Sequence, residues 1–288
     1  MKVAIVTDSN SGIKQSEAEE LGIYVLPMPF TIAGETYFED INLNQESFYE
    51  LLKKGEDIST SQPSIGSVLD LWNELLKKYD EIVHIPMSSG LSETCNTAKT
   101  FSKDFNGKVE VVDNHRISVT QKASVLEALE MSKQGKSAKE IREYLELSKS
   151  DSSIYIMVDT LKYLKKGGRV TAAGAAIGTL LNIKPVLQIQ GGKLDAYQKV
   201  MSVKQAKNAM IKAMQKDLSG KFKALVDSGK MFLAVAHTNN EKNALEFVNE
   251  IKKAIPNVEV VYCDPLSLSV SCHIGPGALA IASYVKNY

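Results

Sequence analysis

The chain has 288 residues, of which 44% are hydrophobic and 24% charged, a composition typical of a globular protein with one or two domains. Its 34 basic residues balance its 34 acidic residues, so no net positive field favours nucleic acid, and the chain has no basic helix typical of a DNA-binding regulator. The three cysteines are odd in number and lack metal-ligand spacing, which predicts a reducing compartment, no disulfide framework and no metal site.

The most apolar stretches are about ten residues long, well short of the ~20 residues that a membrane-spanning helix needs. The first residues, "MKVAIVTDS", lead directly into an apolar strand pattern without a secretory leader. We therefore expect a cytoplasmic protein without stable membrane insertion.

The first half of the chain predicts short apolar strands that alternate with helices. Extended segments are expected at 3–6, 23–30, 81–86 and 109–112, a hairpin at Ala33-Gly34, and helices at 16–21, 45–54, 65–79, 92–101 and within 118–147. In the helix at 65–79, apolar residues recur every three or four positions, as on one buried face. Such alternation favours a mostly parallel sheet with helices on both faces.

The polar stretch Lys149–Ser153 predicts a boundary between a domain at 1–150 and a second domain at 151–288. The second half predicts strands at 154–158, 231–237 and 258–263, a hairpin around Gly191-Gly192, a small-residue helix at 172–181 and a last helix starting at Pro276. The predicted fold class is α/β with two domains, the N-terminal one built on a mostly parallel sheet with flanking helices and the C-terminal one on a mixed sheet with helices.

Two hydroxyl-rich segments each lead into a predicted helix. "MSSGLSETCNTA" (87–98) places Ser92 at a helix start just after a buried strand, where free backbone amides and the helix dipole favour an anion. In "TSQPSIG" (60–66), Ser64 is a plausible helix cap, which leaves Thr60 and Ser61 for another role. Ser92 has the same alternative role as a cap of its own helix.

His273 precedes the sequence "GPGALA", which matches a dinucleotide-binding fingerprint only in its letters, because no βαβ unit follows it. A side chain at this turn can project from a loop held by a rigid scaffold. The other three histidines fit structural or exposed positions.

Six motifs carry a resemblance to a known family: "VTDS", "TSQPS", "SSGLSETCNTA", "KKGGRV", "IKPVL" and "HIGPGALAIA". In this order and spacing they resemble the DegV family, and the similarity spans essentially the whole chain. The resemblance implies a two-domain α/β protein that buries one long-chain fatty acid, palmitate or a similar acid, with no cofactor and no catalytic residue. It also implies a bacterial acyl carrier that presents the acid to a fatty acid kinase for phospholipid synthesis.

The resemblance assigns the fatty-acid carboxylate to Thr60 and Ser92, with His273 in the same polar network. It places further residues near the site: Ser61, Ser89, Arg169 and Gly275. Neutral hydroxyls suit this task because a buried carboxylate is costly unless it is hydrogen-bonded. Burial of a sixteen-carbon tail contributes on the order of 10 kcal/mol before the costs of association.

The sequence departs from the family pattern at Glu93, in the stretch after Asp113 ("NHRISVTQKA"), which often contains glycine in relatives, and at Met201. Glu93 stands where relatives continue the serine motif with glycine, and Met201 stands where some relatives carry an arginine near the pocket mouth. Glu93 is compatible with a nearby anion only if its side chain points to solvent. A hydrolase or acyltransferase that uses Ser92 as nucleophile and His273 as base remains the alternative function.

Overall fold

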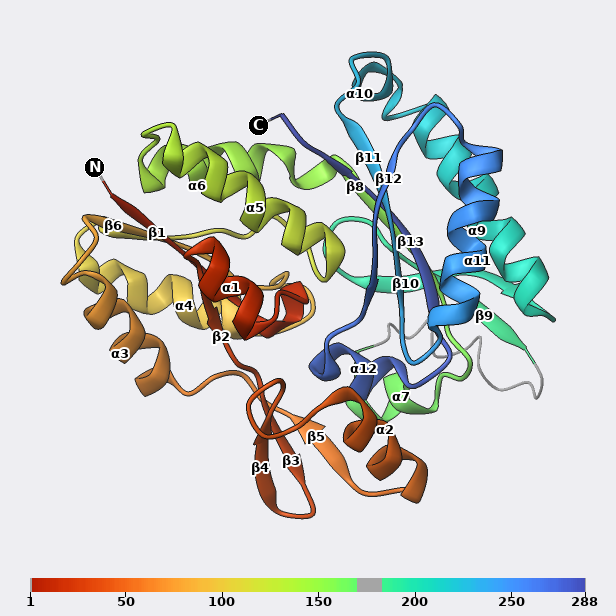
Figure 1. The fold of residues 1–288 in the computed structure, drawn as a ribbon, viewed down its shortest axis with the longest axis horizontal. Coiled ribbons are helices and arrows are strands. Elements are labelled where there is room, and N and C mark those ends of the chain that lie inside the picture. The colour runs from red at the N-terminus through yellow and green to blue at the C-terminus, as the bar shows by residue number, and fades with distance from the viewer. Residues whose placement is uncertain (1, 170–182, 288) are drawn as a thin grey trace. The chain divides into compact units, whose positions relative to one another are not determined.

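The computed structural model describes residues 2–169 and 183–287, which divide into two compact units (Figure 1). Unit 1 contains Met1–Ser150 together with Ser267–Ser269, and unit 2 contains Asp151–Leu266 and Val270–Asn287. No helix in the described ranges is both long enough and apolar enough to cross a membrane. The predicted small-residue helix at 172–181 lies outside these ranges.

Unit 1 is built on a four-stranded parallel sheet with the strand order β2-β1-β6-β7. The strands are β1 (Val3–Asp8), β2 (Tyr24–Leu26), β6 (Glu81–Ile85) and β7 (Val109–Val111). All six residues of β1 are buried, as expected of a strand covered on both faces. The parallel sheet predicted from the alternating pattern is confirmed.

Helices cover both faces of this sheet, and alternate residues of β1 point to opposite layers. Val3 and Ile5 pack with one layer of helices, and Ala4 and Val6 pack with the other. The first layer holds α1 (Gln15–Leu21), α5 (Val119–Lys133) and α6 (Ala138–Leu147), and the second holds α3 (Ile65–Leu75) and α4 (Thr94–Ser102). Short 3-10 helices occur at Ser9–Ser11, Lys103–Phe105 and Ser148–Ser150.

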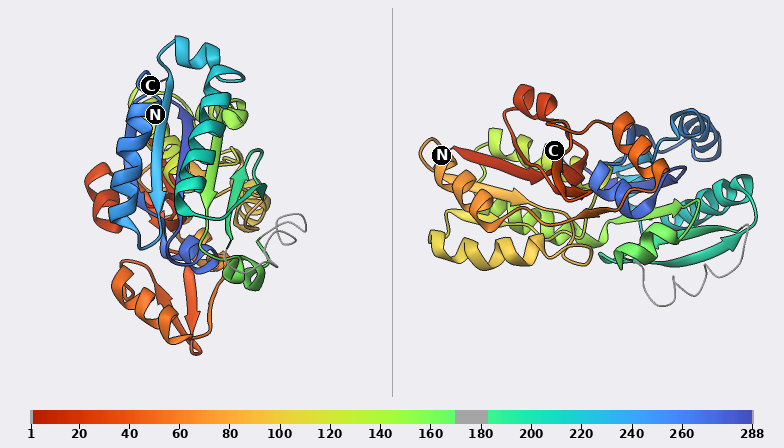
Figure 2. Two further views of the ribbon diagram at one scale, coloured as in Figure 1. Left: turned by 90° about the vertical axis from the view of Figure 1, so that its right-hand side faces the viewer. Right: turned by 90° about the horizontal axis from the view of Figure 1, so that it is seen from below.

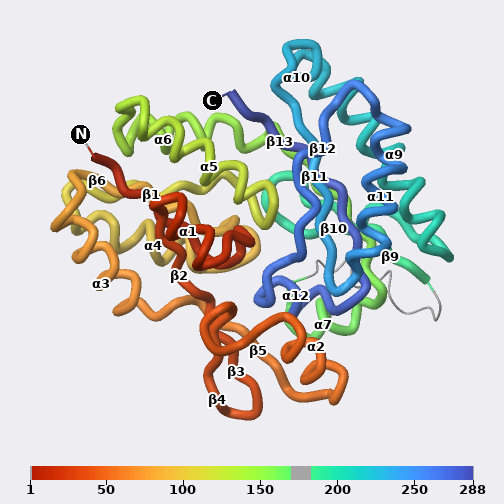
Figure 3. Tube along the Cα trace, viewed as in Figure 1, coloured from red at the N-terminus to blue at the C-terminus, as the bar shows by residue number. Residues whose placement is uncertain are grey.

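A small antiparallel sheet with the order β4-β3-β5 also belongs to unit 1, next to α2 (Figure 3). Its elements are β3 (Pro29–Ile32), β4 (Glu35–Phe38), β5 (Ile58–Thr60) and α2 (Gln45–Lys54). The hairpin predicted at Ala33-Gly34 is confirmed, and both residues have the positive φ that a tight hairpin turn requires. The segment 23–30 divides between β2 and β3, and β5 was not predicted because three residues give no usable periodicity.

Unit 2 contains a six-stranded mixed sheet with the order β10-β9-β8-β13-β11-β12, in which only β11 and β12 pair in parallel. The strands are β8 (Ser152–Met157), β9 (Lys184–Ile189), β10 (Leu194–Val200), β11 (Met231–His237), β12 (Val260–Pro265) and β13 (Leu279–Val285). Two long helices, α9 (Val203–Ser219) and α11 (Glu241–Ala254), cover the same face of the sheet (Figure 2). Shorter helices are α7 (Lys162–Gly167), α10 (Lys223–Asp227) and α12 (Leu268–Ile274). The mixed sheet is confirmed, and with it the α/β fold class.

The prediction of a last helix starting at Pro276 is wrong. The helix of this region, α12, lies before the Gly-Pro-Gly turn, and the residues after the turn form β13 between β8 and β11. Every residue of β13 is buried, and its one serine, Ser283, gives no spacing that separates a strand from a helix. The helix predicted at 65–79 also ends early, at Leu75.

His84 provides a test of the core of unit 1. It lies on β6, fully buried, and its ring meets Trp72 edge-on with 5.6 Å between the ring centroids. Among the described residues, neither ring nitrogen has a hydrogen-bond partner, and burial lowers the pKa of His84 to about 3. The unfolded chain therefore binds a proton below pH 6.5 that the folded chain does not bind until about pH 3.

We expect His84 to destabilise the fold as the pH falls from 6.5 towards 3, by up to about 1.4 kcal/mol per pH unit. His84→Phe removes this proton, so its free energy of unfolding should decline less between pH 6.5 and pH 4 than that of the wild type. Urea unfolding of both proteins at several pH values measures the difference. Parallel pH profiles for the two proteins would contradict the assignment.

Candidate functional site

The polar segments of unit 1 follow the ends of its parallel strands. Met87–Ser92 follows β6, and Asp113–Ser118 follows β7. Because parallel strands end at the same edge of the sheet, these loops meet there. The Ser88 amide donates to the carbonyl of Arg116 (2.8 Å), and the Ser89 amide donates to Oδ1 of Asp113 (3.3 Å). The edge thus holds a serine-rich loop, Met87–Ser92, which we call the serine loop.

Ser92 lies at the end of the serine loop, immediately before α4. Its hydroxyl oxygen accepts a hydrogen bond from the Thr94 amide (3.2 Å) and lies 2.8 Å from the Thr94 hydroxyl. Its side chain is half-buried, whereas that of Glu93 is exposed and accepts a hydrogen bond from the Asn96 side chain. Ser92 therefore helps to start α4, and the Glu93 carboxylate points to solvent as the predicted anion site requires.

Thr60 is the last residue of β5 and pairs with Phe30 of β3. Its side chain is half-buried, whereas Ser61 is exposed and its amide donates to the carbonyl of Pro29 (3.2 Å). Ser64 caps α3 by accepting a hydrogen bond from the Ser67 amide, which confirms the simpler role considered for that residue.

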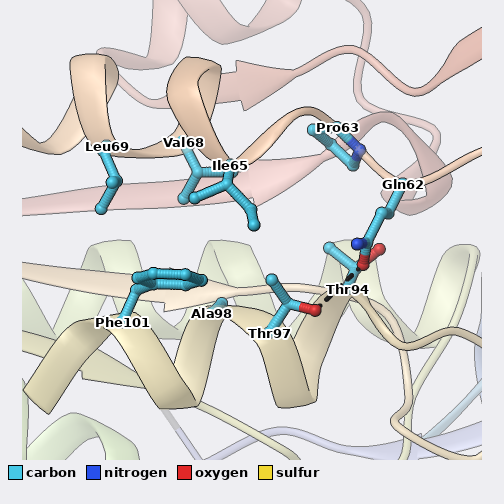
Figure 4. A pocket seen from close by; sticks show the side chains of 9 residues that line it. All are labelled: Gln62, Pro63, Ile65, Val68, Leu69, Thr94, Thr97, Ala98 and Phe101. Carbon is cyan, nitrogen blue, oxygen red and sulfur yellow. Dashed lines mark hydrogen bonds between the residues drawn. The ribbon is translucent and has the colours of Figure 1, made fainter.

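One side-chain hydrogen bond joins the segment after Thr60 to helix α4. The Thr97 hydroxyl donates to Oε1 of Gln62 at 3.1 Å (Figure 4). Apolar side chains of α3 and α4 face each other beside this bond and enclose a cavity of about 10 Å³. Such a volume holds one water molecule, whereas ligand pockets span roughly 300–1,000 Å³. The two hydroxyl segments are therefore neighbours, but the space beside them does not accommodate an acyl chain.

His273, Arg169 and Gly275 gather around helix α7 in unit 2. The imidazole of His273 packs against Gly167, and Nη1 of Arg169 donates to the Gly167 carbonyl. Burial, with a smaller contribution from the Arg169 guanidinium, lowers the pKa of His273 to about 4. The imidazole is therefore neutral at pH 7, with one donor nitrogen and one acceptor nitrogen.

Two glycines make this packing possible. A Cβ on Gly167 would overlap the imidazole of His273, and a Cβ on Gly275 would overlap the ring of Tyr163. Gly275 also has φ +79°, a conformation that favours glycine. The glycines of "KKGGRV" and "HIGPG" thus allow α7 and the turn after α12 to approach closely.

Sequence reasoning missed Thr238, which holds the Gly-Pro-Gly turn. Its fully buried hydroxyl donates to the Gly275 carbonyl (2.6 Å) and accepts from the Ala278 amide (2.9 Å), and its carbonyl accepts from the Gly277 amide (2.7 Å). Thr238 follows the apolar strand β11 directly. Thr238 is thus a polar residue just after a buried strand, the same pattern that singles out the serine loop in the sequence.

The predicted site residues divide between the two units. Thr60, Ser61, Ser89 and Ser92 belong to unit 1, and Arg169, His273 and Gly275 belong to unit 2. Within residues 2–169 and 183–287, no three or more His, Cys, Asp or Glu side chains are placed to hold a metal ion.

The close packing of His273 on Gly167 reverses the usual effect of alanine in a helix. At an open helical position, glycine to alanine stabilises by roughly 0.5–1 kcal/mol. Gly66 in α3 is such a position, since the nearest atom to a new Cβ is 3.8 Å away. We expect Gly66→Ala to stabilise the protein and Gly167→Ala to give no gain or a loss, because the imidazole must move.

In a His273→Ala background, Gly167→Ala should regain the stabilisation that Gly66→Ala gives. Urea unfolding of the four variants measures these differences. An equal gain for both glycine replacements in the wild-type background would show that His273 does not pack where the structure has it.

Comparison with known proteins supports the predicted resemblance. A model of the DegV family of uncharacterised proteins matches residues 2–286. Protein DegV of Bacillus subtilis (strain 168) is 35% identical over 284 residues, 98% of each chain. The solved structure of a fatty acid binding DegV family protein from Thermus thermophilus aligns with a TM-score of 0.87 and 28% identity, over 99% of this chain and 100% of the other. That of the fatty acid binding protein DegV from Bacillus subtilis aligns with a TM-score of 0.85 and 33% identity, over the same shares. The chain belongs to the DegV family.

Proposed function

We propose that this protein binds one long-chain fatty acid and presents its carboxyl group to a fatty acid kinase, which forms the acyl phosphate. The observation that carries the binding role is that two relatives, each aligned over 99% of this chain, are described as fatty acid binding proteins. The kinase partner follows from the resemblance to the family, in which the protein is a carrier and not itself the enzyme.

In this proposal the carboxylate accepts hydrogen bonds from Thr60, Ser92 and His273. Ser92 offers a hydroxyl beside the first amides of α4, where the helix dipole favours negative charge. Thr60 offers a second hydroxyl from the end of β5, and the neutral His273 offers one N–H group. A carboxylate buried with such donors avoids much of its desolvation cost.

Neutral donors also suit the transfer of a phosphoryl group. A carboxylate that is hydrogen-bonded, rather than paired with a buried arginine, keeps an oxygen that is able to attack the γ-phosphorus of ATP. The product carries more negative charge than the acid, and the exposed Arg169 is our candidate for binding it.

The alternative, a hydrolase or acyltransferase with Ser92 as nucleophile and His273 as base, is less well supported. An effective general base has a pKa near the working pH, whereas the pKa of His273 is lowered to about 4. The Ser92 oxygen lies within hydrogen-bond distance of the Thr94 hydroxyl and amide, which fits a role in positioning the start of α4.

Lipid extracted from the purified, denatured protein tests the proposal directly. We expect mass spectrometry to find about one long-chain fatty acid per chain. We also expect the loaded protein, with labelled ATP and the fatty acid kinase of the same cell, to yield acyl phosphate. A delipidated protein that takes up neither palmitate nor oleate would exclude the binding role. Binding without lipid-dependent ATP consumption would leave a storage or transport protein and exclude the kinase partnership.

Variants of the hydroxyls test the carboxylate site. Ser92→Ala and Thr60→Val should each weaken palmitate binding by roughly 1–3 kcal/mol, the range for a hydrogen bond to a charged group. The methyl ester of palmitate should bind the wild type more weakly by a similar amount. Ser64→Ala is the matched control, since it removes a hydroxyl that caps α3 and should cost stability but not affinity. If the ester binds as tightly as the acid, the carboxylate is not held by these groups.

A further inference from the structure

A fully buried carboxylate, Asp8, lies at the end of β1 and is not part of the carboxylate site proposed above. Its Oδ1 accepts hydrogen bonds from the Asn10 amide (3.0 Å), the Asn10 side chain (2.9 Å) and the Gln121 side chain (3.1 Å). Its Oδ2 accepts one from the amide of Met87 (2.9 Å). Burial raises the pKa of Asp8, and these four N–H donors oppose the shift.

The two oxygens of Asp8 therefore have separate tasks. Oδ1 binds groups on the loop after β1 and on α5, whereas Oδ2 binds the first residue of the serine loop. Gln121, which reaches Asp8 from α5, also donates to the Ile85 carbonyl (3.1 Å), two residues before Met87. The end of β6 is thus held on both sides of Pro86.

Asn10 extends this network to the short stretch Ser267–Ser269 of unit 1. The Ser269 hydroxyl donates to Oδ1 of Asn10, whose side-chain amide is bound to Asp8. The Asn10 carbonyl accepts from the amide of Ser118, a residue with φ +55° at the start of α5. One buried carboxylate thus fixes the serine loop and, through Asn10, two further segments.

We propose that Asp8 is a positioning residue for fatty-acid binding, holding the serine loop so that Ser92 meets the carboxylate of the acid without reorganisation. This rests on the proposed function above. Asp8 does not touch the ligand in this proposal. Its effect is preorganisation of the donors, which raises affinity by lowering the cost of ordering the loop when the acid binds.

The geometry explains why the residue is aspartate rather than asparagine. Asparagine has one oxygen and one NH₂ group, and three donors converge on Oδ1, so the NH₂ group takes the place of Oδ2. The NH₂ group of the asparagine then faces the N–H group of Met87, and two donors cannot form a hydrogen bond with each other. Asp8→Asn therefore releases the serine loop while keeping the contacts of Oδ1.

The test compares palmitate with its methyl ester on delipidated protein. We expect Asp8→Asn to reduce the affinity for palmitate about tenfold and to leave the affinity for the ester nearly unchanged, so the ratio of the two falls. In a Ser92→Ala background, Asp8→Asn should change this ratio little, because the group that the loop positions is already absent. Glu127→Gln is the matched control, since Glu127 is a buried carboxylate of unit 1 that accepts from the Tyr144 hydroxyl, and its ratio should equal that of the wild type.

The outcomes separate this inference from the proposed function. Wild-type protein that binds no fatty acid overturns the function itself. Wild-type binding with an equal loss of acid and ester affinity in Asp8→Asn shows that Asp8 only stabilises the fold, and overturns the inference alone. If Asp8→Asn does not fold, Gln121→Met takes its place. It removes the donor that joins Asp8 to the Ile85 carbonyl at the end of β6, just before the serine loop, and must also lower the acid-to-ester affinity ratio.

Discussion

The arrangement of the N-terminal unit depends on one buried carboxyl group, that of Asp8. A carboxylate out of contact with water is costly unless hydrogen bonds replace its hydration, and Asp8 receives four of them from N–H groups. Those groups come from the loop after β1, the loop after β6 and helix α5, so the loops that follow two adjacent strands cannot move independently. The apolar core does not determine the path of these loops, because the strands are buried to the same extent whichever way the chain continues beyond the sheet. The polar network selects one path.

In the second unit, glycine and threonine residues, rather than a buried carboxyl group, hold the loops in place. Gly167 and Gly275 allow two backbone segments to approach to a distance that a methyl group would prevent, and Thr238 uses both its hydroxyl and its carbonyl to hold the turn between α12 and β13. His273 is confined by the same close contact. A histidine in this setting is neutral at pH 7, so its contribution to any ligand is a directed hydrogen bond rather than a charge.

Much of this architecture was predictable from the sequence, because the strands are short apolar runs and the helices carry apolar residues at their own period. The hairpin at Ala33-Gly34 and the cap at Ser64 follow from local chemistry alone. What escaped prediction depends on partners distant in the chain. β13 is buried throughout and its one serine, Ser283, is not enough to mark a period, so its pairing with β8 and β11 makes it a strand. Asp8 and Gln121 are 113 positions apart, and no spacing rule joins them.

On the proposed function, the two ends of the ligand have different tasks. A long acyl tail contributes about 0.8 kcal/mol for each buried methylene, so the larger part of the affinity comes from its length. The head group accepts hydrogen bonds from neutral donors. Each contributes little to the free energy of binding, and that contribution is larger when the donor is already in position before the ligand binds. A buried arginine paired with the carboxylate would instead occupy the oxygen that the proposed partner must phosphorylate. In this proposal, weak preorganised donors at the head and burial of the apolar tail combine tight binding with chemical access to the carboxylate.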